Sequence, residues 1–495
     1  MEQLSATASG HILMFPLPIQ GAVNSMLKLA ELILLSSNGQ ISITFLTSEH
    51  VHNRLLHHTN VATRFNTYPG FTILTFRDGL PENHPRGSDK FMEMLEAVEA
   101  ESRPLLRQML VNNDSTTGEK PITCMIPDGS YNFALDVGKD ARIPVIYFDT
   151  IGPSCLWVYL CLPILIQAGE IPFQENEDME AVVNVPGMGN ILRRRDLPDF
   201  CRTNNPTSEV MIQRISEQAK QFSKASGFIL NTFQDLEQPL LSFICSHFPT
   251  NNIYVVGPLH QHLMAKLSKQ EETIRSYNCS NSFWHEDRSC IDWLNNQPSK
   301  SVIFCSFGSQ VVITKDQLIE FWQGLVNSGS RFLWIQRPRS VIGMDDDIVH
   351  EQQQLPSGLL KGVRENGFIT NWGPQEEILS HPSIGGFLTH SGWNSTIESI
   401  VAGVPMICWP HYVDQLVISR YVSHVWKFGL DMKDTCDRIV IENMVRDLMG
   451  TRKSEFLQNT IAFANLAKQS VEKDGSSCFS LDRLINDIMS FGLPV

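Results

Sequence analysis

Buried strands alternate with amphipathic helices from the beginning of the sequence, and this alternation restricts the possible folds more than any other feature. Residues 12–17 are an apolar run typical of a buried strand, and residues 24–35 repeat apolar side chains at helical spacing. Residues 41–46 form a second predicted strand. A strand, a helix and a further strand in this order predict a βαβ unit, the building block of parallel sheets wound with helices.

The same pattern returns in two series, which predicts two domains. In the first series, further strands are expected at 123–126, 145–148 and 227–230. The pattern stops near residues 255–258, and residues 261–286 are polar and are expected to form an exposed linker. A second series begins with strands at 302–306 and 332–335. A chain of 495 residues has room for two ordinary domains, so we predict an α/β protein with two Rossmann-like domains facing a cleft.

Composition argues against several classes of partner. The formal net charge of −14 disfavours nucleic acid and anionic membranes, because both require a basic face. The longest apolar run, residues 155–166, is too short to span a bilayer, and the N-terminal residues lack the pattern of a signal peptide. The eleven cysteines are scattered without metal-ligand spacing, so no metal is expected. We expect a cytoplasmic monomer whose partners are small molecules, with no nucleic acid and no membrane span.

The segment from Trp372 to Gln415 has the organisation of a nucleotide-sugar site. An apolar run ends at His390, and a Ser-Gly-Trp-Asn turn leads into a short helix that ends at Gly403 before a proline. A strand, a small-residue turn and a helix N-terminus place backbone N–H groups where a diphosphate can bind. The candidate ligands are His390, Asn394 and Ser395 for the phosphates, Glu398 for the ribose, Trp372 for stacking on a base, and Asp414 with Gln415 for sugar hydroxyls.

A second interpretation of the same helix remains open. Ser395 and Glu398 also have the spacing of a capping box, in which both side chains satisfy the helix's own N–H groups. Trp372 alone is typical of a core residue, and a single His is typically an ordinary hydrogen-bonding side chain. The combination of these residues within one segment favours the nucleotide-sugar site.

The segment resembles, nearly position by position, the signature box of plant family 1 UDP-glycosyltransferases. The resemblance implies that Trp372 stacks on uracil, that Glu398 binds the ribose, and that His390, Asn394 and Ser395 hold the diphosphate. It also implies that Trp393, Asn394, Asp414 and Gln415 hold the sugar, and a box ending in Gln usually accompanies UDP-glucose. Outside the core of the box, Ser309 matches a diphosphate contact, Thr150 matches a position close to the sugar, and Gln375 in the Pro-Gln turn belongs to the same donor site.

The resemblance covers essentially the whole chain and implies the GT-B arrangement. We therefore expect an N-terminal acceptor-binding domain at 1–256, a linker and C-terminal UDP-sugar domain at 257–474, and a C-terminal helix at 475–495 that returns to the first domain. The run FPLPIQGAVNSMLKLAEL is most similar to the branch containing the 7-deoxyloganetic acid glucosyltransferases of iridoid biosynthesis. UDP-glucose is expected as a sugar-donor substrate, and no cofactor is expected.

Val413, where a small Ala or Gly is usual, and His411 are minor departures from the family pattern that are expected to narrow the sugar end of the pocket. A larger departure lies in the first loop. In the family, the sugar is transferred with inversion, and a His in a Gln-Gly-His pattern removes the acceptor's proton while a buried Asp orients that His. This chain has Gln20, Gly21 and Ala22, whereas Asp128 matches the orienting carboxylate. His11 should lie at the other end of the first strand and is not expected to replace the base. An acceptor that is already ionised, such as a carboxylate with a pKa of about 4, needs no base.

Three functions therefore remain open. The first is a UDP-glucose-dependent transferase that uses an acidic or self-activating acceptor, or that uses Asp128 directly or through a water. The second is a repurposed enzyme on the same scaffold, and the third is a ligand-binding or partner protein without catalysis. The nearly complete donor site favours the first. The basic run at residues 193–195 is either a solvated face or a contact for an acidic acceptor.

Overall fold

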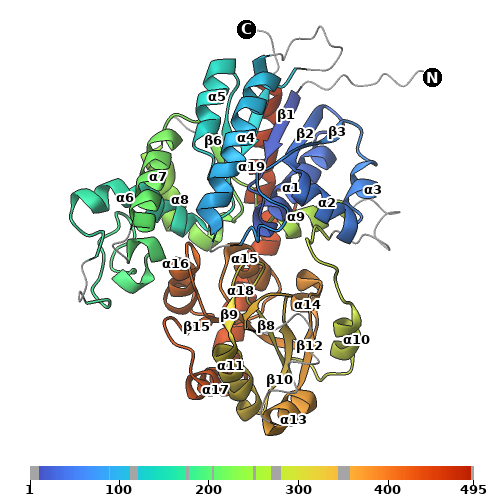
Figure 1. Ribbon diagram of the computed structural model, residues 1–495, viewed down its shortest axis with the longest axis vertical. Helices are drawn as coiled ribbons and strands as arrows, with labels where there is room; N and C mark the ends of the chain where they lie inside the picture. The colour runs from blue at the N-terminus through green and yellow to red at the C-terminus, as the bar shows by residue number, and fades with distance from the viewer. Residues whose placement is uncertain are drawn as a thin grey trace. The chain divides into compact units, whose positions relative to one another are not determined.

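The structure is a computed structural model that describes residues 10–87, 90–111, 121–173, 178–202, 206–248, 252–268, 280–343 and 357–491. Its internal contacts divide the chain into two compact units, each an α/β assembly in Figure 1. Unit 1 contains Met1–Leu160, Gln213–Trp284 and Ala467–Val495, and unit 2 contains Cys161–Ile212 and His285–Leu466. This division differs from the predicted domain boundaries because residues 161–212 group with unit 2, whereas residues 257–284 and 467–474 group with unit 1.

Unit 1 is built on parallel strands. Strands β3 (Phe71–Phe76), β2 (Ile41–Ser48), β1 (Gly10–Phe15) and β4 (Cys124–Pro127) are hydrogen-bonded in this order, and β5 (Ile146–Asp149), β6 (Gly227–Leu230) and β7 (Asn252–Val255) follow. Isolated bridges between Met125 and Val145 and between Asp128 and Phe148 connect β4 to β5. Each described strand pair is parallel, and β1 lies between β2 and β4. This order is that of doubly wound nucleotide-binding sheets.

The first predicted βαβ unit is present in unit 1, although helix α1 (Gln20–Ser36) begins at Gln20 rather than at Asn24. The apolar side of α1 packs on β1 and on the C-terminal helix α19 (Ser476–Phe491), which is drawn in red among the blue elements of Figure 1. The remaining helices of this unit are α2 (Glu49–His58), α3 (Val61–Phe65), α4 (Phe91–Val111), α5 (Phe133–Ala141), α8 (Gln234–His247) and α9 (Leu259–Leu267). Three helices are divided between the two units, because a boundary between the units falls within each of them: α6 (Pro153–Gln167), α7 (Pro206–Phe222) and α18 (Lys453–Val471).

Unit 2 repeats the same strand order. Strands β12 (Gly367–Thr370), β10 (Arg331–Ile335), β8 (Val302–Ser306), β13 (Ile384–Thr389), β14 (Met406–Cys408) and β15 (Gly429–Asp431) form one parallel sheet in this order. Strands β9 (Ile313–Thr314) and β11 (Val341–Ile342) form a small separate ladder. Numbered from β8, the order of the main sheet is 3-2-1-4-5-6, which is the order of the Rossmann fold.

Helices cover the sheet of unit 2 and contribute to its core. Helix α11 (Lys315–Ser328) begins and ends at residues suited to those positions: Thr314 and Gln317 form a capping box, and Gly329 ends the helix with a φ of 73°. The other helices are α10 (Ser289–Asn295), α13 (Ser357–Asn366), α14 (Gln375–Ser380), α15 (Trp393–Val401), α16 (Gln415–Arg420) and α17 (Arg438–Arg446). Two 3₁₀ turns, η3 (Arg194–Asp196) and η4 (Asp199–Cys201), lie in the part of unit 2 that precedes α7 in the sequence. Two π-helical turns, η6 (Tyr421–Val425) and η7 (Asp447–Thr451), follow α16 and α17.

The prediction of an exposed linker over residues 261–286 is wrong for its first part, and also for residues 281–283, which are buried. Residues 259–267 form helix α9, because Leu259, Leu263 and Leu267 recur at helical spacing and are buried against unit 1. Residues 269–279 lie outside the described residues. The segment 280–284 is attached to unit 1, where Arg54 donates hydrogen bonds of 3.1 and 2.8 Å to the carbonyl of Phe283.

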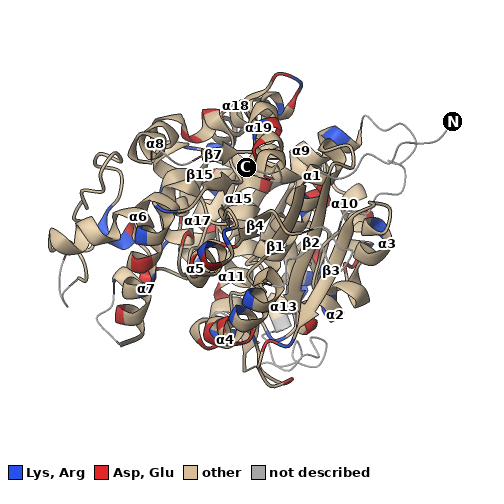
Figure 2. Cartoon of the chain, turned by 90° about the horizontal axis from the view of Figure 1, so that it is seen from above, with Lys and Arg blue, Asp and Glu red and all other residues tan. Residues whose placement is uncertain are grey.

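Charge is mixed over the described surface. Helices α4, α5 and α7 each carry acidic and basic residues (Figure 2). Among the described residues, no helix combines the length and the apolar character that crossing a bilayer requires. The same residues contain no group of three or more His, Cys, Asp or Glu side chains that could hold a metal ion.

Candidate active site

The predicted donor residues gather at the carboxyl edge of the sheet in unit 2. Strands β8 and β13 are neighbours there, and the strand order reverses between them. In such sheets, ligands bind beyond the carboxyl ends of the strands at the point of reversal. Ser309 lies in the turn after β8, and His390 directly follows β13. The topology therefore brings these two predicted residues to one binding position.

His390 is enclosed by two glycines from the two turns. A Cβ atom added to Gly308 would lie 2.6 Å from His390 Cε1, and one added to Gly392 would lie 2.6 Å from His390 Nε2. Neither glycine therefore tolerates a side chain without moving the ring. Desolvation in this enclosure, with a smaller effect of His411, lowers the pKa of His390 to about 3. His390 is consequently a neutral imidazole near pH 7, and it can offer a ligand a hydrogen bond but not a full positive charge.

Helix α15 does not use the predicted capping box. Its N-cap is Gly392, without a side-chain hydrogen bond, and Ser395 is the third residue of the helix rather than its cap. The capping-box interpretation of Ser395 and Glu398 is therefore wrong. The predicted end of the helix is confirmed, because Gly403 has a φ of 64° and the backbone N–H of Val404 donates to the carbonyl of Ser399.

Ser395 and Glu398 instead share a partner from the neighbouring helix α14. The side-chain amide of Gln375 donates 3.0 Å to Ser395 Oγ and 2.8 Å to Glu398 Oε2. Glu398 is only 7% exposed, so an amide donor that fixes its carboxylate also compensates part of its desolvation. The predicted residue Gln375 thus has a definite task, which is to orient the carboxylate expected to bind a ribose.

The two aromatic residues of the predicted site differ in exposure. Trp372 is half-buried, and its carbonyl accepts a hydrogen bond of 2.9 Å from the backbone N–H of Asp287. Trp393 is 2% exposed, and its ring centroid lies 6.3 Å from that of Trp426. The indole of Trp393 therefore belongs to the core, and its backbone is what remains to meet a sugar. Asn394, next to it, is half-buried at the start of α15.

The predicted sugar end of the site is a turn that is bonded to itself. Asp414 is the N-cap residue of α16, and Gln415 is its first residue. Gln415 Oε1 accepts hydrogen bonds from the backbone N–H groups of His411, at 2.9 Å, and Tyr412, at 3.4 Å. Because the amide oxygen is committed to these donors, the Gln415 amide nitrogen is the group left to face a sugar hydroxyl.

Unit 1 presents a second set of predicted residues, also at a point of strand reversal. Asp128 follows β4, and Thr150 follows β5. Asp128 is 3% exposed; its Oδ1 accepts a 2.9 Å hydrogen bond from the backbone N–H of Ser130, and its Oδ2 lies 3.4 Å from the donating hydroxyl of Thr150. Burial raises the pKa of Asp128 above its usual value, although these hydrogen bonds oppose the shift.

Ala22 lies in the first turn of α1, after β1, and is 1% exposed. This turn is fixed by the segment 280–284. Gln20 Nε2 donates 2.9 Å to the carbonyl of Asn281, and Gln20 Oε1 accepts 2.6 Å from the N–H of Phe283. His11 lies at the opposite end of β1 from α1, with its Nε2 2.8 Å from Thr44 Oγ1. The expectation that His11 is remote from the position of Ala22 agrees with this geometry.

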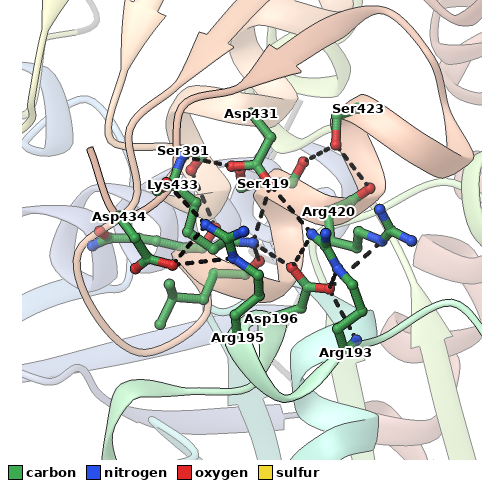
Figure 3. Close-up of polar contacts among 12 residues, drawn as sticks. Arg193, Arg195, Asp196, Ser391, Ser419, Arg420, Ser423, Asp431, Lys433 and Asp434 are labelled. Atoms are coloured by element: carbon green, nitrogen blue, oxygen red, sulfur yellow. Dashed lines mark hydrogen bonds and ion pairs between the residues drawn. The ribbon is translucent and has the colours of Figure 1, made fainter. Parts of the chain in front are cut away.

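Sequence reasoning missed a cluster of charges around Asp196, in the 3₁₀ turn η3 (Figure 3). The Asp196 carboxylate is fully buried and lies 2.6 Å from Lys433 Nζ and 2.8 Å from Arg193 Nε. Desolvation raises the pKa of Asp196, but the hydrogen bond from Arg193 and the charge of Lys433 outweigh it and hold the pKa below its usual value. Asp434 binds Arg195 at 3.0 Å in the same view.

This cluster decides the role of the basic run at residues 193–195. Arg193 and Arg195 are partly exposed, and their guanidinium groups are engaged in ion pairs within unit 2, so they are not a simple solvated face. The guanidinium of Arg194 lies 5.5 Å from the centre of the Phe173 ring. The only sequence signal for this arrangement was the short motif Arg195 to Pro198, whose partners are more than 200 residues away and have no local pattern.

Comparison with known proteins identifies the family. The sequence profile described as UDP-glucoronosyl and UDP-glucosyl transferase matches residues 266–469. The 7-deoxyloganetic acid glucosyltransferase of Catharanthus roseus is 51% identical over 482 residues, which are 97% of this chain and 97% of that protein. The chain belongs to the UDP-glycosyltransferase family. Myricetin 3-O-rhamnoside 1,2-glucosyltransferase of Crocosmia x crocosmiiflora is 39% identical to this UDP-glycosyltransferase over 491 residues, 98% of the chain and 97% of the relative.

Solved structures agree with this UDP-glycosyltransferase over nearly the whole chain. Medicago truncatula UGT71G1, complexed with UDP-glucose, has a TM-score of 0.77 at 26% identity and covers 99% of this chain and 100% of its own. A UDP-glucose:anthocyanidin 3-O-glucosyltransferase in complex with UDP has a TM-score of 0.79 at 21% identity, with 97% and 99% covered. The predicted α/β class and GT-B fold are confirmed.

Proposed function

We propose that this UDP-glycosyltransferase is an inverting, UDP-glucose-dependent glucosyltransferase acting on a small plant specialised metabolite. The observation that supports this most directly is the hydrogen-bonded set of Gln375, Ser395 and Glu398 beside the enclosed His390, at the strand reversal of unit 2. A nearly buried carboxylate oriented by an amide suits the two hydroxyls of a ribose. A relative that is 51% identical is named for 7-deoxyloganetic acid, so a terpenoid or iridoid, phenolic or carboxylic acid is the class of acceptor that we infer.

The donor roles follow the chemistry of each group. We infer that Trp372 stacks on the uracil, that Glu398 accepts from the ribose hydroxyls, and that Gln375 orients Glu398. The diphosphate would be bound by neutral donors, because the low pKa of His390 keeps its ring uncharged. The remaining assignments are Ser309, Asn394 and Ser395 to the diphosphate, Asp414 and Gln415 to the glucose hydroxyls, the Trp393 backbone to the sugar, and Thr150 to the side of the sugar that faces the acceptor.

The proposed reaction is a single displacement. The acceptor oxygen forms a bond to the anomeric carbon of glucose while the bond from that carbon to the diphosphate oxygen breaks, and UDP leaves with the electron pair. We infer that Ala22 occupies the position where the family has its His base. General-base catalysis contributes about 10²–10⁴ to the rate, so transfer to a neutral hydroxyl would be slow. An ionised carboxylate acceptor has no proton to lose, and for it the missing base is without consequence.

Of the His and Asp pair that is usual in the family, we infer that this chain retains only the Asp, at Asp128. Burial raises its pKa toward neutrality, which is the direction that a general base requires. Its Oδ2 also accepts from the Thr150 hydroxyl. We therefore infer that Asp128 acts on neutral acceptors only weakly, directly or through a water.

The donor assignment is tested by thermal denaturation with UDP, UDP-glucose and UDP-galactose. We expect UDP-glucose to stabilise the protein, by about 2.7 kcal/mol at a hundredfold excess over its dissociation constant. Turnover is then measured with paired carboxylic and phenolic acceptors. The absence of a thermal shift with both UDP and UDP-glucose would contradict the proposed function.

The proposed consequence of Ala22 is tested by Ala22→His. We expect glucosylation of neutral alcohols or phenols to increase tenfold or more, and that of carboxylates to change little. Ala22→Leu, which adds bulk without a base, is the matched control, and Asp128→Asn in the Ala22→His background should remove the gain. Equal gains for both acceptor classes would refute acceptor ionisation as the compensation.

Ala22 is also the one observation that favours another function. A protein that binds UDP-glucose but transfers glucose to no acceptor, with or without Ala22→His, would be a repurposed enzyme or a ligand-binding protein. In that case the donor-binding half of the proposal stands and the transferase half falls.

A further inference from the structure

Val413 has an unusual backbone conformation at the sugar end of the donor site. Its φ is 57°, in the left-handed region, and it precedes Asp414 and Gln415 directly. A β-branched side chain disfavours this region strongly, so the conformation persists only where the surrounding structure enforces it. The residue that follows the strained position is one of the two proposed to read the glucose hydroxyls.

Asp199 supplies a contact that holds the backbone of Val413 in this conformation from outside the turn. Its carboxylate Oδ1 accepts a hydrogen bond of 2.9 Å from the backbone N–H of Val413. Asp199 begins the 3₁₀ turn η4, and Val413 lies 214 residues further along the chain. Both residues belong to unit 2, so this bond connects the segment 161–212 to the turn that carries Gln415.

The position of Asp199 is itself well anchored. Three residues before it, Asp196 is bound by Arg193 and Lys433, and Arg420 Nε lies 3.6 Å from Asp196 Oδ2 (Figure 3). Arg420 also donates 2.8 Å to the carbonyl of Ile191. Arg420 is the last residue of α16, and Gln415 is the first. The segment 191–199 therefore contacts both ends of the element that begins with the proposed sugar-reading residue.

The turn has little tolerance for movement. The Gln415 amide oxygen is held by the N–H groups of His411 and Tyr412, and the Gln415 carbonyl accepts 3.2 Å from the hydroxyl of Ser391. A change of conformation at Val413 would shift Asp414 and Gln415 relative to these partners. Displacements of this kind weaken directional hydrogen bonds more than they weaken stacking or phosphate contacts.

We propose that Asp199 is a positioning residue for sugar selection, which holds the Val413 turn so that Asp414 and Gln415 meet the hydroxyls of the donor hexose. Asp199 acts through the backbone of Val413 and does not itself touch the sugar. This inference rests on the proposed function, since it requires a UDP-hexose in the site. It assigns a donor-selecting task to the segment 161–212, which comes from the first half of the sequence.

The test compares binding of UDP, UDP-glucose and UDP-galactose by calorimetry to full-length variants. Asp199→Ala removes the acceptor, and we expect UDP-glucose to bind roughly tenfold more weakly, the effect of one hydrogen bond, while UDP changes by less than twofold. The preference for UDP-glucose over UDP-galactose should fall as well. Asp199→Asn keeps an oxygen that can accept from the N–H of Val413, and it should restore both properties.

Two further variants separate positioning from general stability. Asp434→Asn removes the ion pairs of Arg195 and Arg202 at 3.0 Å but retains a residue type that tolerates the φ of 64° at position 434, and it should leave all three affinities unchanged. Val413→Gly removes the backbone strain, so Asp199→Ala combined with Val413→Gly should recover most of the lost UDP-glucose affinity.

A selective loss of UDP-glucose affinity in Asp199→Ala, restored by Asn and by the second-site glycine, supports the proposal. Equal weakening of UDP and UDP-glucose, or no change in either, overturns it and leaves the donor assignment intact. Failure of the wild-type protein to bind UDP-glucose overturns this inference together with the proposed function. If Asp199→Ala does not fold, an Asp199→Asn variant with the wild-type melting temperature but reduced UDP-glucose affinity also overturns the proposal.

Discussion

The task assigned to Gln375 leads to a quantitative prediction about nucleotide recognition. Gln375→Leu keeps the volume of the side chain but removes the amide that donates 2.8 Å to Glu398 and 3.0 Å to Ser395. A hydrogen bond to a charged group contributes about 1.5–3 kcal/mol, and Glu398, at 7% exposure, has little water to replace it. If Glu398 is then no longer held for the ribose, the dissociation constant for UDP should rise by roughly 10- to 100-fold.

The sharper readout is the contribution of the ribose 2′-hydroxyl. We expect the wild-type protein to prefer UDP over 2′-deoxy-UDP, because Glu398 is proposed to accept from both ribose hydroxyls. In Gln375→Leu this preference should fall toward one, whereas contacts to the base and the diphosphate remain. Isothermal titration calorimetry with the two nucleotides measures the ratio directly.

The matched control is Glu377→Gln on the same helix, α14. It removes an exposed ion pair with Arg288 at 2.7 Å, a type of contact that contributes about 0–1 kcal/mol, and it should change neither affinity. Our reasoning is refuted if Gln375→Leu weakens UDP and 2′-deoxy-UDP by the same factor, or if it leaves UDP binding unchanged while the melting temperature is preserved.

Three further predictions follow from burial, packing and charge. Burial raises the pKa of Glu237 from its usual 4.5 to about 8, so the folded state holds a proton that the unfolded state loses. The stability linked to this proton is fully present below pH 4.5 and is lost as the pH rises through 8, by roughly 1.4 kcal/mol for each unit by which the pKa is raised. Glu237→Gln should therefore raise the melting temperature more at pH 8 than at pH 5, and equal changes at the two pH values would contradict this prediction. Gly308→Ala adds a Cβ 2.6 Å from His390 at a φ of 69° and should weaken UDP more than tenfold, so unchanged titration curves would show that His390 does not contact the diphosphate. Because the pKa of His390 is lowered to about 3, the affinity for UDP-glucose should stay constant from pH 8 to pH 5, and a steep increase toward pH 5 would show a cationic His390.

The sequence was most informative where structure follows from local pattern. The strands at 227–230 and 302–306 and the helix end at Gly403 were predictable because apolar runs and terminal glycines act over a few residues. His390 was predicted at the end of an apolar run and directly follows strand β13, whereas Ser309 was implied only by the family resemblance. These predictions needed no knowledge of distant contacts.

The errors and omissions have one physical origin, which is competition from partners far along the chain. Residues 259–267 were partly assigned to a polar linker but form a helix, because Leu259, Leu263 and Leu267 share one side that is buried against unit 1. Ser395 and Glu398 have the spacing of a capping box, but Gly392 is the N-cap of the helix, and both side chains accept hydrogen bonds from the Gln375 amide instead. Local spacing could not predict the proposed positioning role of Asp199, because its hydrogen-bond partner Val413 lies 214 residues away in the sequence.

Helix α19 has a consequence for synthesis on the ribosome. Its residues Leu481, Leu484 and Ile488 share a core with Ile12 and Val23. Residues 285–466, which belong to unit 2, are therefore synthesised before the last part of unit 1. Translation proceeds at about 5–20 residues per second, and the stretch between Trp284 and α19 takes roughly 10–40 s to emerge. During that interval the apolar side of α1 is incomplete, and unit 2 can finish folding first. A nascent chain stalled before α19 would therefore present exposed hydrophobic surface on unit 1 until this helix is synthesised.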